Sequence, residues 1–278
     1  MANLSVMLCA FHGLITDGSL QPRALVDAIV GARLGAVEPM LSDLDLAPAP
    51  WQEVLDLCQE AGLEVSCLDI GANLVGNSPE DRAEAFRTVE RALDLCARMN
   101  CPLGLIYGSA PAPGMSNEDG RKIYSQGLAH CAEMAKSRHI TACIEDFGGS
   151  AAFACRSDHV REVVTGAGAE VRVVWDNGNF ILADELPMHA YDVLRDLTVH
   201  VHIKDFVFDE TGQASLKSTA GKAYKGTQIG KGDTQVAECV AALKRDGYGG
   251  WLSLEVGGPP VEQMLAGAEF LKKVWAEA

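Results

Sequence analysis

The sequence is poor in positive charge. Of its 278 residues, 23 are Lys or Arg and 38 are Asp or Glu, which gives a formal net charge of −15. Such a chain repels nucleic-acid phosphates and anionic membrane surfaces. Its start, MANLSVMLCAF, lacks a basic segment before the short apolar run, and no stretch approaches the roughly 20 apolar residues that span a bilayer. We therefore expect a cytoplasmic protein that binds neither nucleic acid nor membrane.

Two common motif classes are also missing. The nine cysteines are an odd number without a CxxC pair, so neither a disulfide framework nor a zinc ribbon is indicated. We interpret most of them as small core residues in a reducing compartment. The glycine-dense stretches FGGS, GTQIGKGD and VGGPP do not supply G-x-G-x-x-G after the first strand, which argues against a dinucleotide-binding fold.

Short β-rich apolar runs alternate with helical patterns about eight times. Helices are predicted over 79–99 and 117–138, where Ser78 and Ser116 are candidate N-caps followed by acidic residues. The candidate strands are 4–11, 36–40, 64–70, 103–108, 140–147, 171–177, 198–206 and 251–256. Strict alternation predicts a parallel sheet, and eight units favour an α/β fold with a single (β/α)8 TIM barrel over residues 1–278.

Alternation along the later strands predicts which side chains enter the barrel. In the seventh strand one face carries Val199, Val201 and Ile203 and the other carries His200, His202 and Lys204. We expect the apolar face to pack against helices, so that both histidines point inward. The same argument directs Cys143 and Glu145, Val174 and Asp176, and Ser253 and Glu255 inward.

Four neighbouring strands thus place an ionisable side chain near the carboxyl end, where barrel enzymes build their sites. Three carboxylates beside an imidazole repel one another unless a cation neutralises them. We therefore predict one divalent metal ion held by Glu145, Asp176, His202 and Glu255. The oxygen-rich set favours Mn2+, Mg2+ or Co2+, and Zn2+ also fits. Taken singly, each residue could instead form a salt bridge or a satisfied core contact.

Several segments, in order and spacing, resemble the xylose isomerase-like TIM-barrel superfamily. This is the sugar phosphate isomerase/epimerase group, to which endonuclease four is related. The segments are IEDF, WDNGN, VHVHIKD, IGKGD and GYGGWLSLE. The resemblance implies one divalent metal on the Glu, Asp, His, Glu set that matches Glu145, Asp176, His202 and Glu255.

The resemblance also implies an activity. In similar ketose 3-epimerases the two metal-binding glutamates exchange a substrate proton through an enediolate, and the matching pair here is Glu145 and Glu255. We therefore expect a metal-dependent isomerase or epimerase of a small sugar or keto-polyol, acting in carbohydrate metabolism. Lys204, one pleat above His202, could neutralise an enediolate oxygen or pair with a neighbouring carboxylate.

This chain departs from the tagatose 3-epimerase pattern at three positions, which argues against a free ketohexose. Asn179, Ala151 and Phe208 stand where a His, a second Glu and an Arg would be expected. Asn179 remains a predicted substrate-binding residue. So do His12 and Glu38, if Val6, Leu8 and Ala10 face the interior; the alternative for both is a salt bridge at the rim.

Three other functions stay open. A lyase or dehydratase would use the same metal and base on a keto-sugar, inosose or dehydroshikimate-like substrate. An endonuclease is disfavoured by the net charge and by missing histidine ligands, and a non-catalytic binding module would not need two inward glutamates. The oligomeric state is undetermined, and a homo-oligomer is compatible with the sequence.

The longest predicted irregular segment is 207–233, after the seventh strand. Its glycines and near absence of apolar residues predict a polar lid over the pocket. One or more of its lysines would then reach a carboxylate or phosphate of the ligand, and the alternative is a static, solvated loop. These lysines are Lys217, Lys222, Lys225 and Lys231.

Overall fold

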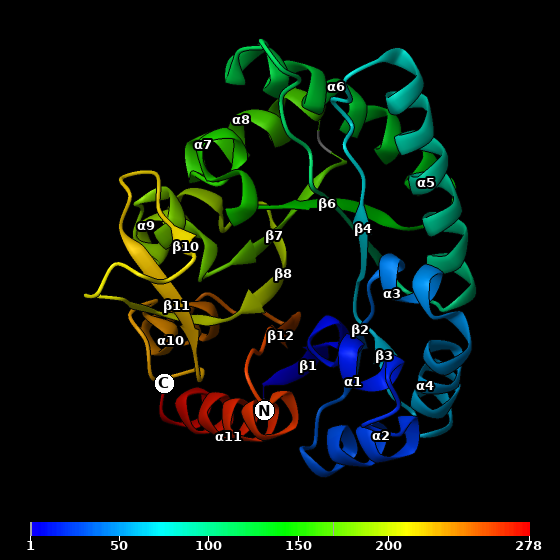
Figure 1. Ribbon diagram of the computed structural model, residues 1–278, viewed down its shortest axis with the longest axis vertical. Helices are drawn as coiled ribbons and strands as arrows, with labels where there is room; N and C mark the ends of the chain where they lie inside the picture. Colours follow the sequence, from blue (N-terminus) through cyan, green and yellow to red (C-terminus); the bar gives the residue numbers. More distant parts are fainter. Residues whose placement is uncertain (1, 169) are drawn as a thin grey trace.

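In the computed structural model, which describes residues 2–168 and 170–278, parallel strands form a central barrel with helices around it (Figure 1). The sheet order is β3-β2-β1-β12-β8-β7-β6-β5-β4. Its strands are β1 (Asn3–Met7), β2 (Ala36–Glu38), β3 (Glu64–Val65), β4 (Leu68–Gly71), β5 (Leu103–Tyr107), β6 (Thr141–Glu145), β7 (Arg172–Asp176), β8 (Thr198–Ile203) and β12 (Trp251–Leu254). β3 and β4 are two halves of one predicted strand. β3 pairs with β2, and a bridge between Met40, just after β2, and Asp69 of β4 closes the barrel. The predicted TIM barrel is confirmed.

The predicted helix starts are also confirmed. The Ser78 and Ser116 hydroxyls accept hydrogen bonds from the backbone N–H groups of Asp81 and Asp119, at 3.1 and 3.0 Å. The helices are α1 (His12–Thr16), α2 (Pro22–Gly31), α3 (Leu41–Leu46), α4 (Pro48–Glu60), α5 (Pro79–Arg98), α6 (Asn117–Lys136), α7 (Ala151–Ala154), α8 (Ser157–Ala167), α9 (Pro187–Leu194), α10 (Val236–Arg245) and α11 (Pro260–Glu277). Among the described residues, none of these helices has the length and apolar character needed to cross a bilayer.

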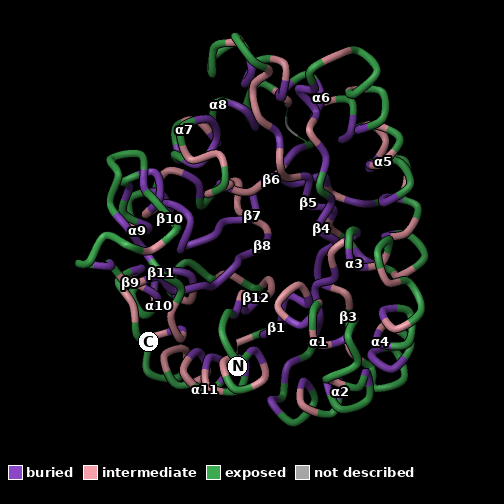
Figure 2. The backbone as a smooth tube through the Cα atoms, viewed as in Figure 1, coloured by how far each residue is buried: buried purple, intermediate pink, exposed green. Residues whose placement is uncertain are grey.

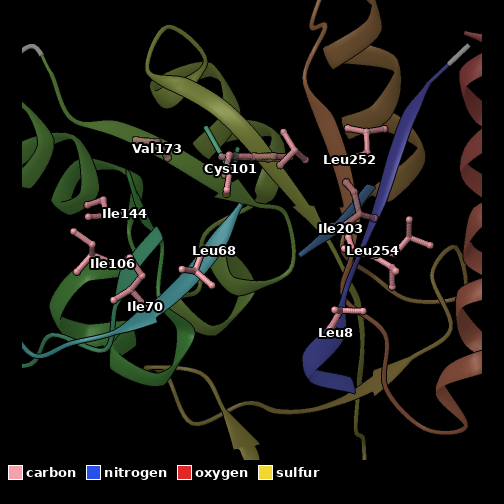
Figure 3. Packing of buried hydrophobic residues seen from close by; sticks show 14 of the residues in the cluster. Leu8, Leu68, Ile70, Cys101, Ile106, Ile144, Val173, Ile203, Leu252 and Leu254 are labelled. Atoms are coloured by element: carbon pink, nitrogen blue, oxygen red, sulfur yellow. The ribbon is translucent and has the colours of Figure 1, made fainter. Parts of the chain in front are cut away.

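The main core lies between the barrel and its helices. Burial is concentrated along the central strands, whereas the outer helix faces are exposed (Figure 2). Alternate strand residues such as Ile106, Ile144 and Ile203 pack in this layer (Figure 3). A separate small cluster fills the barrel interior and consists of Cys67, Leu105, Cys143 and Val174. The predicted inward direction of Cys143 and Val174 is therefore confirmed.

Two predicted strand directions are wrong. Val199 packs against the interior cluster because the β7–β8 register shifts, pairing Val173 with Thr198 but Val174 with His200. Val6 of β1 and Leu8, which follows the strand, belong to the outer core layer, and Met7 lines the cavity described below. The strand ends at Met7 and the chain continues as a short 3-10 helix, Leu8–Phe11, so period-two alternation does not extend to His12.

The segment predicted to be irregular instead forms much of a second sheet. β9 (Asp205–Phe208), β10 (Leu216–Lys217) and β11 (Ala223–Thr227) are antiparallel in the order β10-β11-β9. Its apolar residues suffice for a small core of its own, in which Phe206 and Tyr224 are buried with Leu182. The expectation that 207–233 is irregular is therefore wrong, whereas its closure over a bound ligand stays a prediction.

The four lysines of this segment are exposed, and none of them lines the cavity. Lys217 donates to the carbonyl of Gly212 at 2.7 Å, and Nζ of Lys222 lies 3.4 Å from Oδ1 of Asp184. The predicted reach of these lysines toward a ligand therefore finds no support in this arrangement.

Asp184 anchors the turn between β10 and β11. Its carboxylate accepts hydrogen bonds from the hydroxyls of Ser218 and Thr219 and from the backbone N–H of Ala220. These bonds, with Lys222, hold the pKa of Asp184 below its ordinary value, although burial opposes the shift.

We expect Asp184→Ala to increase proteolytic cleavage within 209–222 by about tenfold, because local opening then loses these contacts. Asp184 has φ 55°, so Asp184→Asn, which tolerates that backbone and keeps acceptor atoms, should give a smaller increase. Limited proteolysis with mass mapping measures the rates. Equal cleavage of Asp184→Ala and the unchanged protein would rule out the anchor.

Candidate active site

Three predicted metal ligands meet at the carboxyl ends of their strands. Glu145 ends β6, Asp176 ends β7, and His202 lies in β8. One ligand atom from each lies within 4.8 Å of the other two. Oε2 of Glu145 is 3.5 Å from Nδ1 of His202. The group combines two carboxylates with one imidazole.

Glu38 supports the imidazole from the opposite side. Its two carboxylate oxygens lie 2.9 Å from Nε2 of His200 and Nε2 of His202, and all three residues are fully buried. Burial alone would raise the pKa of Glu38, but the charges of the two histidines hold it well below its ordinary value. Burial would lower the pKa of His202, whereas Glu38 and Glu145 raise it well above its ordinary value. The contact fixes the ring so that Nδ1 faces Glu145.

Lys204 bridges the carboxylates of Asp176 and Glu255. Its Nζ lies 2.8 Å from Oδ2 of Asp176 and 2.6 Å from Oε2 of Glu255, and it donates to Oδ1 of Asn179 at 3.1 Å. Burial alone would lower the pKa of Lys204, but the two carboxylates hold it well above its ordinary value. The ammonium group therefore carries its charge between Asp176 and Glu255. Glu255 is not part of the three-residue group around His202.

Backbone and loop contacts hold this arrangement in place. Asp146 accepts a hydrogen bond from the backbone N–H of Asp176 at 2.9 Å. The side chain of Asn177 accepts from the backbone N–H of Lys204 and donates to Thr234. Asp205 accepts from the backbone N–H groups of Gly230 and Gly232 within the IGKGD stretch. The residues after β7 and β8 are thus tied to one another.

A cavity of about 480 Å³ opens above these residues. Its acidic and basic lining residues are Asp69, Glu145, Lys204 and Glu255. The remaining lining residues are Met7, Cys9, Met40, Tyr107, Phe147, Gly148, Gly149, Asn179, Leu182, Phe206 and Leu216. The charged groups lie at the barrel's carboxyl end, and the small sheet contributes Phe206 and Leu216 to the wall.

The donor set fits a divalent cation. Nδ1 of His202 is buried and has no hydrogen-bond partner among the described residues, although Nε2 of the same ring is held by Glu38. A ligand histidine fixed through its second nitrogen by a carboxylate is the usual arrangement at metal sites. Cation binding at Nδ1 would displace any proton there. Glu145, Asp176 and His202 therefore form a group that could hold the ion.

Two predicted substrate-binding residues lie elsewhere. Glu38 is buried beneath the cavity, and its position suits orientation of the histidines rather than substrate contact. His12 begins α1, away from the cavity lining, and its Nδ1 lies 2.8 Å from Oδ1 of Asp43. Asn179 does line the cavity.

The sequence reasoning overlooked Asp69 and Asp146. Asp69 is buried on the cavity wall, and its Oδ1 has no hydrogen-bond partner in the described ranges. Burial raises the pKa of Asp69 well above its usual range, and the charge of Glu38 adds to the shift. The sequence contains a pattern that indicates Asp69: it is the polar residue between Leu68 and Ile70 in an apolar strand. The same pattern identifies Asp176.

The fold and the site together define a TIM barrel with an acid-rich, metal-compatible cavity at the carboxyl end of its strands. The chain belongs to the xylose isomerase-like TIM-barrel family, whose sequence profile matches residues 26–274. A sequence search of curated proteins found no match.

Solved structures with the same fold carry different activities. The chain resembles 3-keto-D-glucoside 4-epimerase YcjR from E. coli, with 17% identity, TM-score 0.74, and coverage of 98% of this chain and 100% of that one. It also resembles the probable 3-DHS dehydratase AsbF from Bacillus anthracis, with 14% identity, TM-score 0.74, and coverage of 98% and 99%. A third is a xylose isomerase-like TIM barrel protein from Mycobacterium smegmatis in complex with magnesium, with 13% identity, TM-score 0.72, and coverage of 100% and 97%.

Proposed function

We propose that this protein is a divalent-metal-dependent isomerase or epimerase of a small keto-sugar or keto-polyol. The observation that carries the proposal is the pair Glu145 and Glu255. Both line the cavity; Glu145 belongs to the group with Asp176 and His202, and Glu255 is joined to Asp176 through Lys204. Family membership and the epimerase activity named for one structural neighbour support the class of reaction.

The cofactor in this proposal is one divalent ion, with Mn2+, Mg2+ or Co2+ preferred by the oxygen-rich donors and Zn2+ also compatible. Glu145, Asp176 and His202 would hold it, with Glu255 as the fourth ligand once Lys204 yields its contact. When bound, such an ion polarises a carbonyl and stabilises negative charge on oxygen. The neighbour solved with magnesium is consistent with this chemistry.

The protein's own residues then handle the proton. One of Glu145 and Glu255, as a carboxylate, takes the proton beside the substrate carbonyl. The other, which has taken a proton from solvent, gives it to the resulting enediolate, and proton exchange with water then restores both groups. The Lys204 ammonium group donates a hydrogen bond to the oxygen on which charge develops. Asn179, held between Asp176 and Lys204, keeps the ammonium group in place.

A lyase or dehydratase is the second candidate, and Asp69 favours it. This carboxyl group is buried on the cavity wall, and one of its oxygens has no hydrogen-bond partner among residues 2–168 and 170–278, so in its neutral form it could protonate a departing hydroxyl group. The fold is shared with AsbF, which is named as a probable 3-DHS dehydratase, and this is consistent with the second candidate.

Product analysis separates the two candidates. The metal-loaded protein is incubated with a panel of keto-sugars, inososes and dehydroshikimate, and products are followed by mass spectrometry and NMR. An isomerase or epimerase yields a product of unchanged mass with a moved carbonyl or an inverted centre. Loss of water from the only substrates turned over would replace the proposal with the lyase.

A substitution at Gly178 tests whether the position of the Lys204 side chain matters for turnover. A Cβ at this position would overlap Cγ of Lys204 and lie 2.9 Å from its Cδ. We therefore expect Gly178→Ala to displace the ammonium group and lower kcat at least about tenfold, with no loss of folding. Gly226→Ala is the matched control, because its Cβ meets no atom within 4 Å. Unchanged kcat in Gly178→Ala would show that the position of Lys204 does not limit turnover.

A further inference from the structure

Apolar side chains line part of the cavity beside its charged groups. The centroid of the Phe206 ring lies 5.8 Å from Nζ of Lys204. Phe147 follows β6, Leu182 belongs to the 3-10 helix Asn179–Ala183, and Phe206 and Leu216 come from the second sheet. Leu182 and Phe206 are packed into the small core of that sheet, so this wall is held by structure beyond the barrel. Leu216 is 37% exposed although it lines the cavity. An apolar group placed against Leu216 would remove this surface from water.

No cation remains for an anionic substituent. Lys204 is the only Lys or Arg that lines the cavity in the described part of the chain, and Asp176 and Glu255 already contact its ammonium group. The carboxylates of Glu145 and Glu255 also place negative charge on the cavity wall. A phosphate or sulfate would enter without a compensating partner, at a cost in desolvation.

We propose that the part of the ligand that meets Leu216 is an uncharged, apolar substituent, with Leu216 setting this preference. The ligand class is thus a keto-sugar or keto-polyol bearing an aryl or alkyl group, and sugar phosphates are excluded. The identity of the reacting end rests on the proposed function. The preference for an apolar substituent next to Leu216 follows from the cavity wall itself.

Cys9 provides a reporter that requires no knowledge of the substrate. It is partly exposed on the cavity wall, whereas the other eight cysteines are buried. Three maleimides with the same electrophile and different N-substituents serve as probes: phenyl, methyl and 2-sulfoethyl. Their labelling rates on the folded protein are divided by their rates with 2-mercaptoethanol, which cancels intrinsic reactivity. Labelling that persists in Cys9→Ser would arise from another thiol and is subtracted.

The expected order of normalised rates is phenyl, then methyl, then sulfoethyl, with about fivefold between phenyl and methyl for a ring that packs on an apolar wall. Leu216→Lys should reduce the phenyl preference and raise the sulfoethyl rate at least about fivefold through local charge. Phe208→Lys is the matched control, because Phe208 is 45% exposed on the same sheet but does not line the cavity. It should leave the order unchanged.

Equal phenyl and methyl rates, or a sulfoethyl rate at or above the methyl rate, would overturn the proposal. An equal response of Leu216→Lys and Phe208→Lys would overturn the role of Leu216. This readout is independent of turnover. A protein that shows the predicted order but transfers no proton would therefore retain this inference and lose the proposed function.

Discussion

His202→Ala is expected to weaken Mn2+ binding by at least about 100-fold while the barrel remains folded, because an imidazole ligand with a fixed orientation is lost. Nδ1 of His202 faces Glu145, and Nε2 is fixed by Glu38. Isothermal titration with Mn2+ and metal analysis of the purified protein give affinity and occupancy. Circular dichroism checks the fold, and His202→Gln repeats the test with a smaller change in volume.

His200→Ala is the matched control for this experiment. His200 lies on the same strand, is equally buried and contacts the same Glu38 carboxylate, but it is not part of the group with Glu145 and Asp176. Its removal should cost less than about tenfold in Mn2+ affinity, since it acts only through Glu38. Full metal occupancy in His202→Ala, or equal losses in the two variants, would contradict the proposed ligand set.

Glu145→Gln and Glu255→Gln should each reduce turnover by about 1,000-fold, within the range expected for loss of a positioned general acid or base. An amide keeps the shape of the side chain but cannot take up the substrate proton. Because both residues are also proposed ligands, metal occupancy is measured in parallel and turnover is compared at saturating metal. Glu118→Gln, at an exposed position on α6, should leave turnover unchanged.

Turnover within tenfold of the unchanged protein in either variant, at full occupancy, would remove that glutamate from the chemistry. A loss in only one of them would point to a reaction with a single carboxylate base. Either result would require another proton carrier on the cavity wall, and Asp69, the third carboxyl group among the lining residues, is a candidate.

The barrel could be predicted because its periodicities are simple. Strands with one apolar face and one polar face give a direction for their polar side chains, such as His200 and His202 in β8. Strand β1 does not, because apolar side chains occupy both faces: Val6 packs outward and Met7 lines the cavity. The register shift that turns Val199 toward the interior depends on the pairing of two strands, which no single strand's pattern contains.

The alternation of side chains along the strands predicted that Glu145, Asp176 and His202 would lie together. It did not predict which residues surround them. Glu38 was expected in the pocket, and only the fold shows that it lies beneath both histidines. The sequence allows Lys204 either to neutralise an enediolate oxygen or to pair with a carboxylate. In the structure its ammonium group lies between Asp176 and Glu255. The second sheet was missed because its few apolar residues lie far apart in sequence, and Phe206 and Tyr224 meet only after β9 and β11 pair.

Solvent isotope incorporation tests the central claim, which is proton transfer by carboxylates beside a metal site. The metal-loaded protein is allowed to turn over its keto-sugar in D2O, and the product is examined by NMR. The account predicts deuterium at the reacting carbon, because a proton held by Glu145 or Glu255 exchanges with solvent before it returns. Product formed at an undiminished rate without deuterium at that carbon would contradict it and would indicate a hydride shift.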